Sequence, residues 1–170
     1  MTRKTKHLVR AAIIAALYAA LTHMQNILLP GSATWAIQCR ISEALCVLAF
    51  FTPAAIPGLT IGCLVFNLTF AAALPLDWLI GTLATFLAAY GMRATRKIRI
   101  KGYPLLGMLM PALTNAILVG WELQLYIGGS FWINALYVAL GELIVMATFG
   151  TALLRVLEKG HLGKRLFPRI

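Results

Sequence analysis

The basic stretch Arg93-Ala94-Thr95-Arg96-Lys97-Ile98-Arg99-Ile100-Lys101 lies between two long apolar parts of the chain and decides how the chain folds. It is the middle of three clusters that hold most of the fifteen basic residues; the others are 3–10 and 159–169. Cytoplasmic segments of membrane proteins carry an excess of Lys and Arg, so we expect all three clusters on the cytoplasmic side. The chain must then cross the bilayer an even number of times between successive clusters.

The composition indicates a polytopic membrane protein. The chain has 170 residues, of which 61% are hydrophobic and 12% are charged, and its mean hydropathy is +0.84. The basic residues that give the chain its net charge of +10 flank the apolar spans. There we expect them to contact anionic lipid headgroups or partner proteins rather than nucleic acid. The three cysteines lack the spacing of metal ligands and are interpreted as packing residues. We expect no metal and no cofactor.

Outward from the basic stretch, apolar runs bounded by Gly and Pro predict six helices. Their approximate ranges are 8–29, 41–51, 58–74, 76–91, 105–126 and 131–154. Four precede the middle cluster and two follow it, so the number of predicted crossings between successive basic clusters is even in both cases. We therefore expect one all-α integral membrane domain over 1–170, with six transmembrane helices and cytoplasmic N and C termini. The second helix is short, and we expect it to be tilted, partly outside the bilayer, or extended by 35–40.

The first helix resembles a signal peptide, but it continues without an obvious cleavage site, so we expect it to be retained. It carries two ladders of alanine at fourfold spacing: Ala11, Ala15, Ala19 and Ala12, Ala16, Ala20. Small residues at this spacing allow another helix to approach closely, whether that helix belongs to this chain or to another protein. The alternative is that alanine is simply common in such helices.

Four charged residues fall within or beside the apolar spans: Arg40, Glu43, Glu122 and Glu142. Arg40 and Glu43 are three apart, close enough to pair on a helix. A rise of about 1.5 Å per residue puts Glu122 in the outer leaflet and Glu142 near mid-membrane. Carboxylates at such depths are costly unless they face a cavity or a partner, and one arginine cannot neutralise three glutamates. At least one glutamate is expected to face a ligand cation, a proton or water.

Amide and aromatic side chains accompany these charges: Gln38, Asn67, Asn115, Asn134, Trp35, Trp121, Trp132 and Tyr137. Together with the carboxylates they suit a planar, hydrogen-bonding heterocycle that can carry positive charge. The alternative is that Trp and Tyr lie at the membrane interface and that asparagines join helices. The sequence contains no phosphate-binding loop and no catalytic motif, so we expect neither an enzyme nor a chain that powers transport by itself.

Three separated segments resemble the QueT family of queuosine-precursor transporters. They are Gln38-Cys39-Arg40-Ile41-Ser42-Glu43-Ala44-Leu45 with the following 50–54, then 115–123, and 131–142. This resemblance implies the six-helix fold of the substrate-binding S component of an energy-coupling factor (ECF) transporter, in the bacterial plasma membrane. The implied ligand is a 7-deazaguanine, such as the 7-aminomethyl precursor or queuine.

The resemblance also implies partners: one membrane coupling subunit and two ATPases. It suggests that the alanine face of the first helix docks on the coupling subunit and that the S component topples in the membrane to release substrate. The expected substrate contacts are Glu142, Glu122, Asn134, Gln38, Arg40, Glu43, Trp132, Asn115, Asn67, Tyr137 and Trp35, and the expected docking residues are Ala11, Ala12, Ala15, Ala16 and Ala19. A second function stays open: a self-contained proton-coupled carrier in which a membrane glutamate carries the proton.

Overall fold

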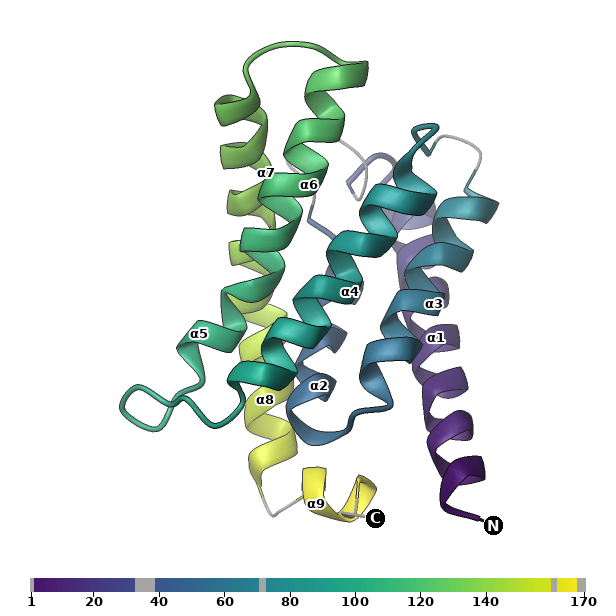
Figure 1. Ribbon diagram of the computed structural model, residues 1–170, viewed down its shortest axis with the longest axis vertical. Helices are drawn as coiled ribbons and strands as arrows, with labels where there is room; N and C mark the ends of the chain where they lie inside the picture. Colours follow the sequence, from purple (N-terminus) through teal and green to yellow (C-terminus); the bar gives the residue numbers. More distant parts are fainter. Residues whose placement is uncertain (1, 33–38, 71–72, 160–161, 168–170) are drawn as a thin grey trace.

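The computed structural model describes residues 2–32, 39–70, 73–159 and 162–167, and this part of the chain is helical apart from short connections (Figure 1). The elements in chain order are α1 (Arg3–Leu28), a 3₁₀ helix η1 (Ile41–Val47) that runs into α2 (Leu48–Phe51), α3 (Ala55–Thr69), α4 (Asp77–Thr95), α5 (Leu105–Met108), α6 (Met110–Tyr126), α7 (Phe131–Val145), the π-helical η2 (Met146–Gly150), α8 (Thr151–Glu158) and α9 (Leu162–Leu166). With η1 joined to α2, α5 to α6, and α7 to η2 and α8, the expected all-α fold with six main helices is confirmed.

The helix bounds differ from the sequence prediction at several ends. The first helix begins at Arg3 rather than 8, and the last continues to Glu158 rather than 154. The third helix begins at Ala55 and carries Pro57 in its first turn, where the missing N–H of proline costs no helical hydrogen bond. It ends at Thr69, five residues before the predicted end at 74. The fourth helix extends to Thr95, so the basic stretch begins within its last turn.

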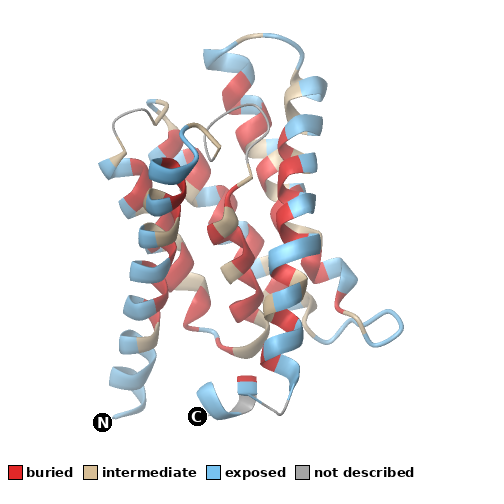
Figure 2. Ribbon diagram, turned by 180° about the vertical axis from the view of Figure 1, so that it is seen from behind, coloured by how far each residue is buried: buried red, intermediate tan, exposed pale blue. Residues whose placement is uncertain are grey.

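The outer surface of the bundle is apolar. Large side chains such as Leu8, Ile27, Leu68, Ile117 and Leu136 are more than half exposed, and exposed positions run along every long helix (Figure 2). Among the described residues, three continuous helical segments are long and apolar enough to cross a membrane: Arg3–Leu28, Leu105–Tyr126 and Phe131–Glu158. The surface is therefore suited to lipid, while six membrane crossings with cytoplasmic termini remain a prediction.

The chain runs back and forth between two ends of the bundle (Figure 1). The first turn of α1, the connection from α4 to α5, and α9 share one end, which we call the basic end. The turn between α6 and α7 lies at the opposite end. All three basic clusters thus come together at one end, as an even number of crossings between them requires.

The short η1 segment lies in the middle of the bundle. Around it, α1 packs on α3, α3 on α4, α4 on α6, and α6 on α7, while η1 itself contacts α1, α4 and α7. This segment is about half as long as a membrane-spanning helix, and its central place explains how it is accommodated, because neighbouring helices surround it. Thr52 and Pro53 then turn the chain into α3 at the basic end.

Glycines in α3 set the distance between α1 and α3. A Cβ on Gly62 would lie 2.7 Å from the backbone oxygen of Ala15, and a Cβ on Gly58 would lie 2.8 Å from that of Ala11. Ala11 and Ala15 are buried in this contact. One of the two predicted alanine ladders is thus used for packing inside the chain.

Candidate functional site

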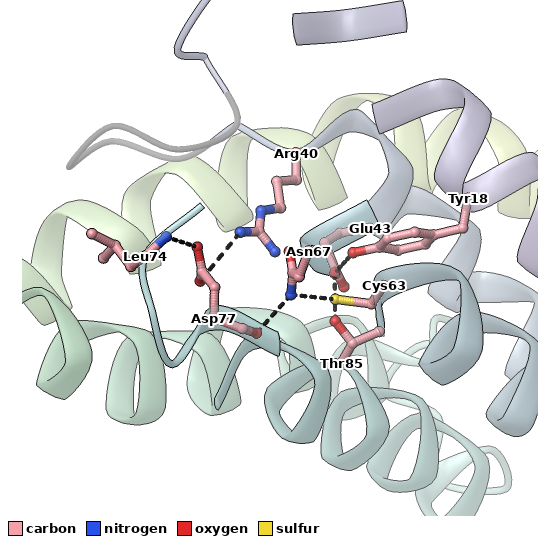
Figure 3. A network of polar contacts seen from close by, with 8 residues as sticks. All are labelled: Tyr18, Arg40, Glu43, Cys63, Asn67, Leu74, Asp77 and Thr85. Atoms are coloured by element: carbon pink, nitrogen blue, oxygen red, sulfur yellow. Dashed lines mark hydrogen bonds and ion pairs between the residues drawn. The ribbon is translucent and has the colours of Figure 1, made fainter. Parts of the chain in front are cut away.

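Arg40 is buried between the helices at the start of η1, with 1% of its surface exposed. Its guanidinium lies 3.9 Å from a carboxylate oxygen of Asp77 and over the ring of Phe66, 5.9 Å from the ring centroid (Figure 3). A buried charge is tolerated only with such compensation. Arg40 thereby ties the start of η1 to α3 and α4.

Glu43 is fully buried one turn further along η1. One of its carboxylate oxygens accepts hydrogen bonds from the Tyr18 hydroxyl at 2.5 Å and from the Thr85 hydroxyl at 2.9 Å. The thiol of Cys46 donates to the other oxygen at 3.2 Å. Because its donors come from α1, η1 and α4, Glu43 joins three elements at the centre of the bundle.

Asp77 begins α4 and faces inward. The backbone N–H of Leu74 donates to its carboxylate at 3.1 Å, and the Asn67 amide donates to its backbone oxygen at 2.7 Å (Figure 3). Gly81 lies beneath this group: a Cβ there would be 3.0 Å from the Asn67 amide nitrogen and 3.4 Å from the Asp77 carboxylate. Glycine at this position therefore leaves room for the polar side chains.

Glu122 on α6 and Glu142 on α7 are also buried, with 0% and 1% of their surfaces exposed. Glu122 interacts electrostatically with Asp77 and Arg40. Glu142 interacts in the same way with Glu43 and Arg40. We call Arg40, Glu43, Asp77, Glu122 and Glu142 the Arg40 cluster. The cluster thus holds four carboxyl groups and one guanidinium.

The carboxylates of the Arg40 cluster are not equally satisfied. Within the described part of the chain, both carboxyl oxygens of Glu122 and the Oε2 atom of Glu142 are buried without a hydrogen-bond donor. The same holds for the side-chain oxygen of Asn67. The Oδ1 atom of Asp77 also lacks a donor there, but it lies 3.9 Å from the Arg40 guanidinium. Leaving a buried acceptor unpaired costs about 1–3 kcal/mol, and more for a charged group. These acceptors can take hydrogen bonds from a ligand or, in the carboxyls, bind a proton.

The carboxylates surround Arg40 without converging on a common point. Among the described residues, no three His, Cys, Asp or Glu side chains lie close enough to hold a metal ion.

Cys39, in the connection before η1, is half-buried. Burial, with a smaller contribution from Glu142, raises the pKa of its thiol. That thiol therefore stays protonated at neutral pH.

The structure separates the predicted amide and aromatic contacts. Asn67 belongs to the site, whereas the buried Asn115 donates to the Pro111 carbonyl of its own helix at 3.0 Å, and Asn134 donates to the Gly128 carbonyl in the α6–α7 turn at 3.0 Å. Trp132 and Tyr137 are 77% and 40% exposed on α7 and are not brought into the Arg40 cluster. Their exposure fits the interface alternative. Gln38 and Trp35 lie outside the described residues.

Sequence reasoning misses three residues that organise the site: Asp77, Tyr18 and Gln25. The sequence pattern marks Asp77 only as a helix start, although it is one of just five acidic residues in the chain. Gln25 is buried in α1; its amide donates to Ser32 and to the Cys39 carbonyl, and its oxygen accepts from the N–H of Ile41. A polar side chain within an apolar helix is the available signal for Gln25.

One comparison with known proteins identifies a relationship. The family model described as QueT transporter matches residues 8–159, which is most of the chain. Comparison with curated proteins and with solved structures finds no match. The matched region contains the whole Arg40 cluster, most of α1 and the other five main helices.

Proposed function

The chain belongs to the QueT transporter family, and on that premise we propose that it is the substrate-binding subunit of an ATP-driven ECF importer. Its substrate is a queuosine precursor of the 7-deazaguanine class, and its location is the bacterial plasma membrane. The family and the apolar helices together make the chain a membrane-bound transporter component. The substrate, the ATP-driven partner and the number of crossings are the proposed part.

The observation that supports this ligand is a pair of buried acidic side chains, Glu122 and Glu142, which have carboxyl oxygens without a hydrogen-bond donor among the described residues. A deazaguanine presents two adjacent N–H donors on its guanine-like edge, which one carboxylate accepts in a two-point contact. The 7-aminomethyl form adds an ammonium that needs a second acceptor. Glu122 and Glu142, on neighbouring helices α6 and α7, divide these two tasks in our proposal.

The close packing of α6 and α7 keeps the two glutamates on neighbouring backbones. A Cβ on Gly120 would lie 2.8 Å from the backbone of Ala135, so only glycine allows this approach. The Asn67 side-chain oxygen, also without a donor among the described residues, is a further acceptor for a ring N–H. Asn115 supports α6 from within, and its role toward the ring remains a proposal.

The charge balance of the Arg40 cluster favours a cationic ligand. Its four carboxylates exceed its one arginine, and removing ionised carboxylates from water costs several kcal/mol each unless positive charge compensates. A bound ammonium supplies that charge, whereas neutral guanine does not. We therefore expect the 7-aminomethyl ligand to bind more tightly than guanine.

The proposed contact with the coupling subunit is narrowed by the packing of α1. Ala11 and Ala15 are buried against α3, and Ala19 is partly buried. Ala12, Ala16 and Ala20 are exposed. The exposed ladder is free to receive a helix of another subunit, and we propose it as the docking face.

The runner-up function, a proton-coupled carrier, is favoured by the same unpaired carboxylates, because a buried carboxylate without a donor also binds protons. Uptake of radiolabelled 7-aminomethyl-7-deazaguanine into proteoliposomes separates the two. Our proposal predicts uptake only when the coupling subunit, both ATPases and ATP are present. Uptake by the chain alone under a proton gradient would establish the carrier instead.

A further inference from the structure

A second polar site lies at the basic end of the bundle. It is a cavity of about 690 Å³, lined by six basic side chains from the first turns of α1 and from the end of α4 and the residues just after it. The end of α2, the α2–α3 connection and one phenylalanine after α9 complete the lining. The basic residues are Arg3, His7, Arg10, Arg93, Arg96 and Lys97. None of the described residues that line it is acidic.

None of the five acidic side chains is available to neutralise this cavity. Four of them belong to the Arg40 cluster. The fifth, Glu158, pairs with Arg99 at 2.7 Å, outside the cavity. Like charges gathered in one cavity repel, and Arg93 and Arg96 are close enough to do so. No acidic side chain of the protein therefore supplies a counter-charge for this cavity, and an anionic group of another molecule can do so.

Three of the basic side chains also have structural partners. Arg96 donates to the backbone oxygen of Arg93 at 2.8 Å. Arg93 donates to the backbone oxygens of Ala49 and Phe50 at the end of α2, at 3.2 and 3.3 Å. Arg10 lies over the ring of Phe167, 5.8 Å from its centroid. These contacts hold the walls of the cavity in place while leaving their positive charge uncompensated.

The surroundings of the cavity indicate an amphiphilic anion. On α1, the cavity-lining residues His7 and Arg10 are interleaved with Leu8, Val9 and Ile13, which are exposed apolar side chains. A single molecule with a phosphate group and an acyl chain would place the phosphate in the cavity and the chain along the exposed face of α1. The leaflet expected to face this end carries anionic headgroups that attract Lys and Arg.

We propose that the cavity at the basic end is a binding site for the phosphate headgroup of an anionic phospholipid, whose acyl chains lie along the apolar face of α1. This inference is independent of the ligand at the Arg40 cluster. The bound lipid would join the start of α1 to the end of α4, two segments that the basic charges otherwise push apart.

The test compares two lipids on the full-length protein in detergent by native mass spectrometry. Phosphatidylglycerol and phosphatidylcholine with identical acyl chains serve as probes, and soluble glycerophosphoglycerol and inorganic phosphate serve as the free-phosphate arms. The variants are Arg10→Gln/Arg96→Gln and, at exposed positions that carry little folding risk, Arg3→Gln/Lys97→Gln. Lys101→Gln/Arg155→Gln removes the same charge outside the cavity and is the matched control.

We expect the wild-type chain to retain phosphatidylglycerol in preference to phosphatidylcholine, and each cavity variant to weaken that retention about tenfold or more, since each basic residue near anionic lipid contributes substantially to binding. The control variant should retain the lipid. Equal losses in the control, equal retention of both lipids, or equally strong binding of the soluble phosphates would each overturn the proposal. The proposal would also be overturned if the cavity variants no longer bound the coupling subunit but retained the lipid unchanged, because the cavity would then be a protein contact.

Discussion

Replacing Glu142 with glutamine should weaken binding of the 7-aminomethyl ligand without destabilising the empty protein. Glutamine keeps the shape of the side chain but exchanges one acceptor oxygen for an NH₂ donor. The Oε2 atom of Glu142 is buried without a donor among the described residues. In our proposal this oxygen accepts a charge-assisted hydrogen bond from the ligand, which the substitution removes. Such a bond contributes about 1.5–3 kcal/mol, which corresponds to a loss of roughly ten- to a hundredfold in affinity.

The empty protein should respond in the opposite direction. Glu142 is repelled by Glu43 and, to a smaller extent, attracted by Arg40, so neutralising it removes a net repulsion. The midpoint of thermal unfolding should therefore stay the same or rise. Isothermal titration calorimetry with 7-aminomethyl-7-deazaguanine and with guanine measures the affinities, and Glu158→Gln, at the surface, is the matched control. Unchanged affinity in both Glu142→Gln and Glu122→Gln would contradict the proposed site.

Three further predictions concern coupling, the core and topology. Ala16→Leu, on the exposed ladder, should reduce uptake while ligand binding persists. Ala15→Leu, buried against Gly62, should lower the unfolding midpoint, because overpacking costs about 1–3 kcal/mol. If neither variant reduces uptake, α1 is not the docking face. Tyr18→Phe leaves one oxygen of Glu43 without its shortest hydrogen bond and should cost about 1–3 kcal/mol of stability in chemical unfolding, and no change would show that this hydrogen bond contributes little. Reporter fusions should be cytoplasmic at Gly102 and after Ile170 and external at Ser32 and Gly129, and a cytoplasmic reporter at Gly129 would exclude the six-crossing topology.

The fold is largely predictable because its signals are local. Apolar runs broken by Gly and Pro mark the six main helices, and the basic clusters predict which ends of those helices lie together. The predicted bounds of the third helix are wrong because Pro57 fits the first turn of a helix as well as the end of one. Hydropathy alone does not distinguish these two uses of proline.

The candidate site is only partly predictable. Depth in the membrane identifies Glu122 and Glu142, but it does not say which face of a helix a residue occupies. Because lipid-facing and core-facing side chains are both apolar here, periodicity does not separate Trp132 from the interior. The role of Asp77 depends on Arg40, which is 37 positions away in the sequence, and no local pattern indicates that contact.

The identity of the small molecule that the protein carries when purified is the most direct test of the proposed function. The full-length chain, purified from cells in mild detergent, is denatured, and the released compounds are identified by mass spectrometry. We predict a 7-deazaguanine released in about equimolar amount from the wild-type chain and absent from Glu142→Gln. Release of a different class of solute from the wild-type protein, at the same stoichiometry and with the same dependence on Glu142, would contradict the assignment.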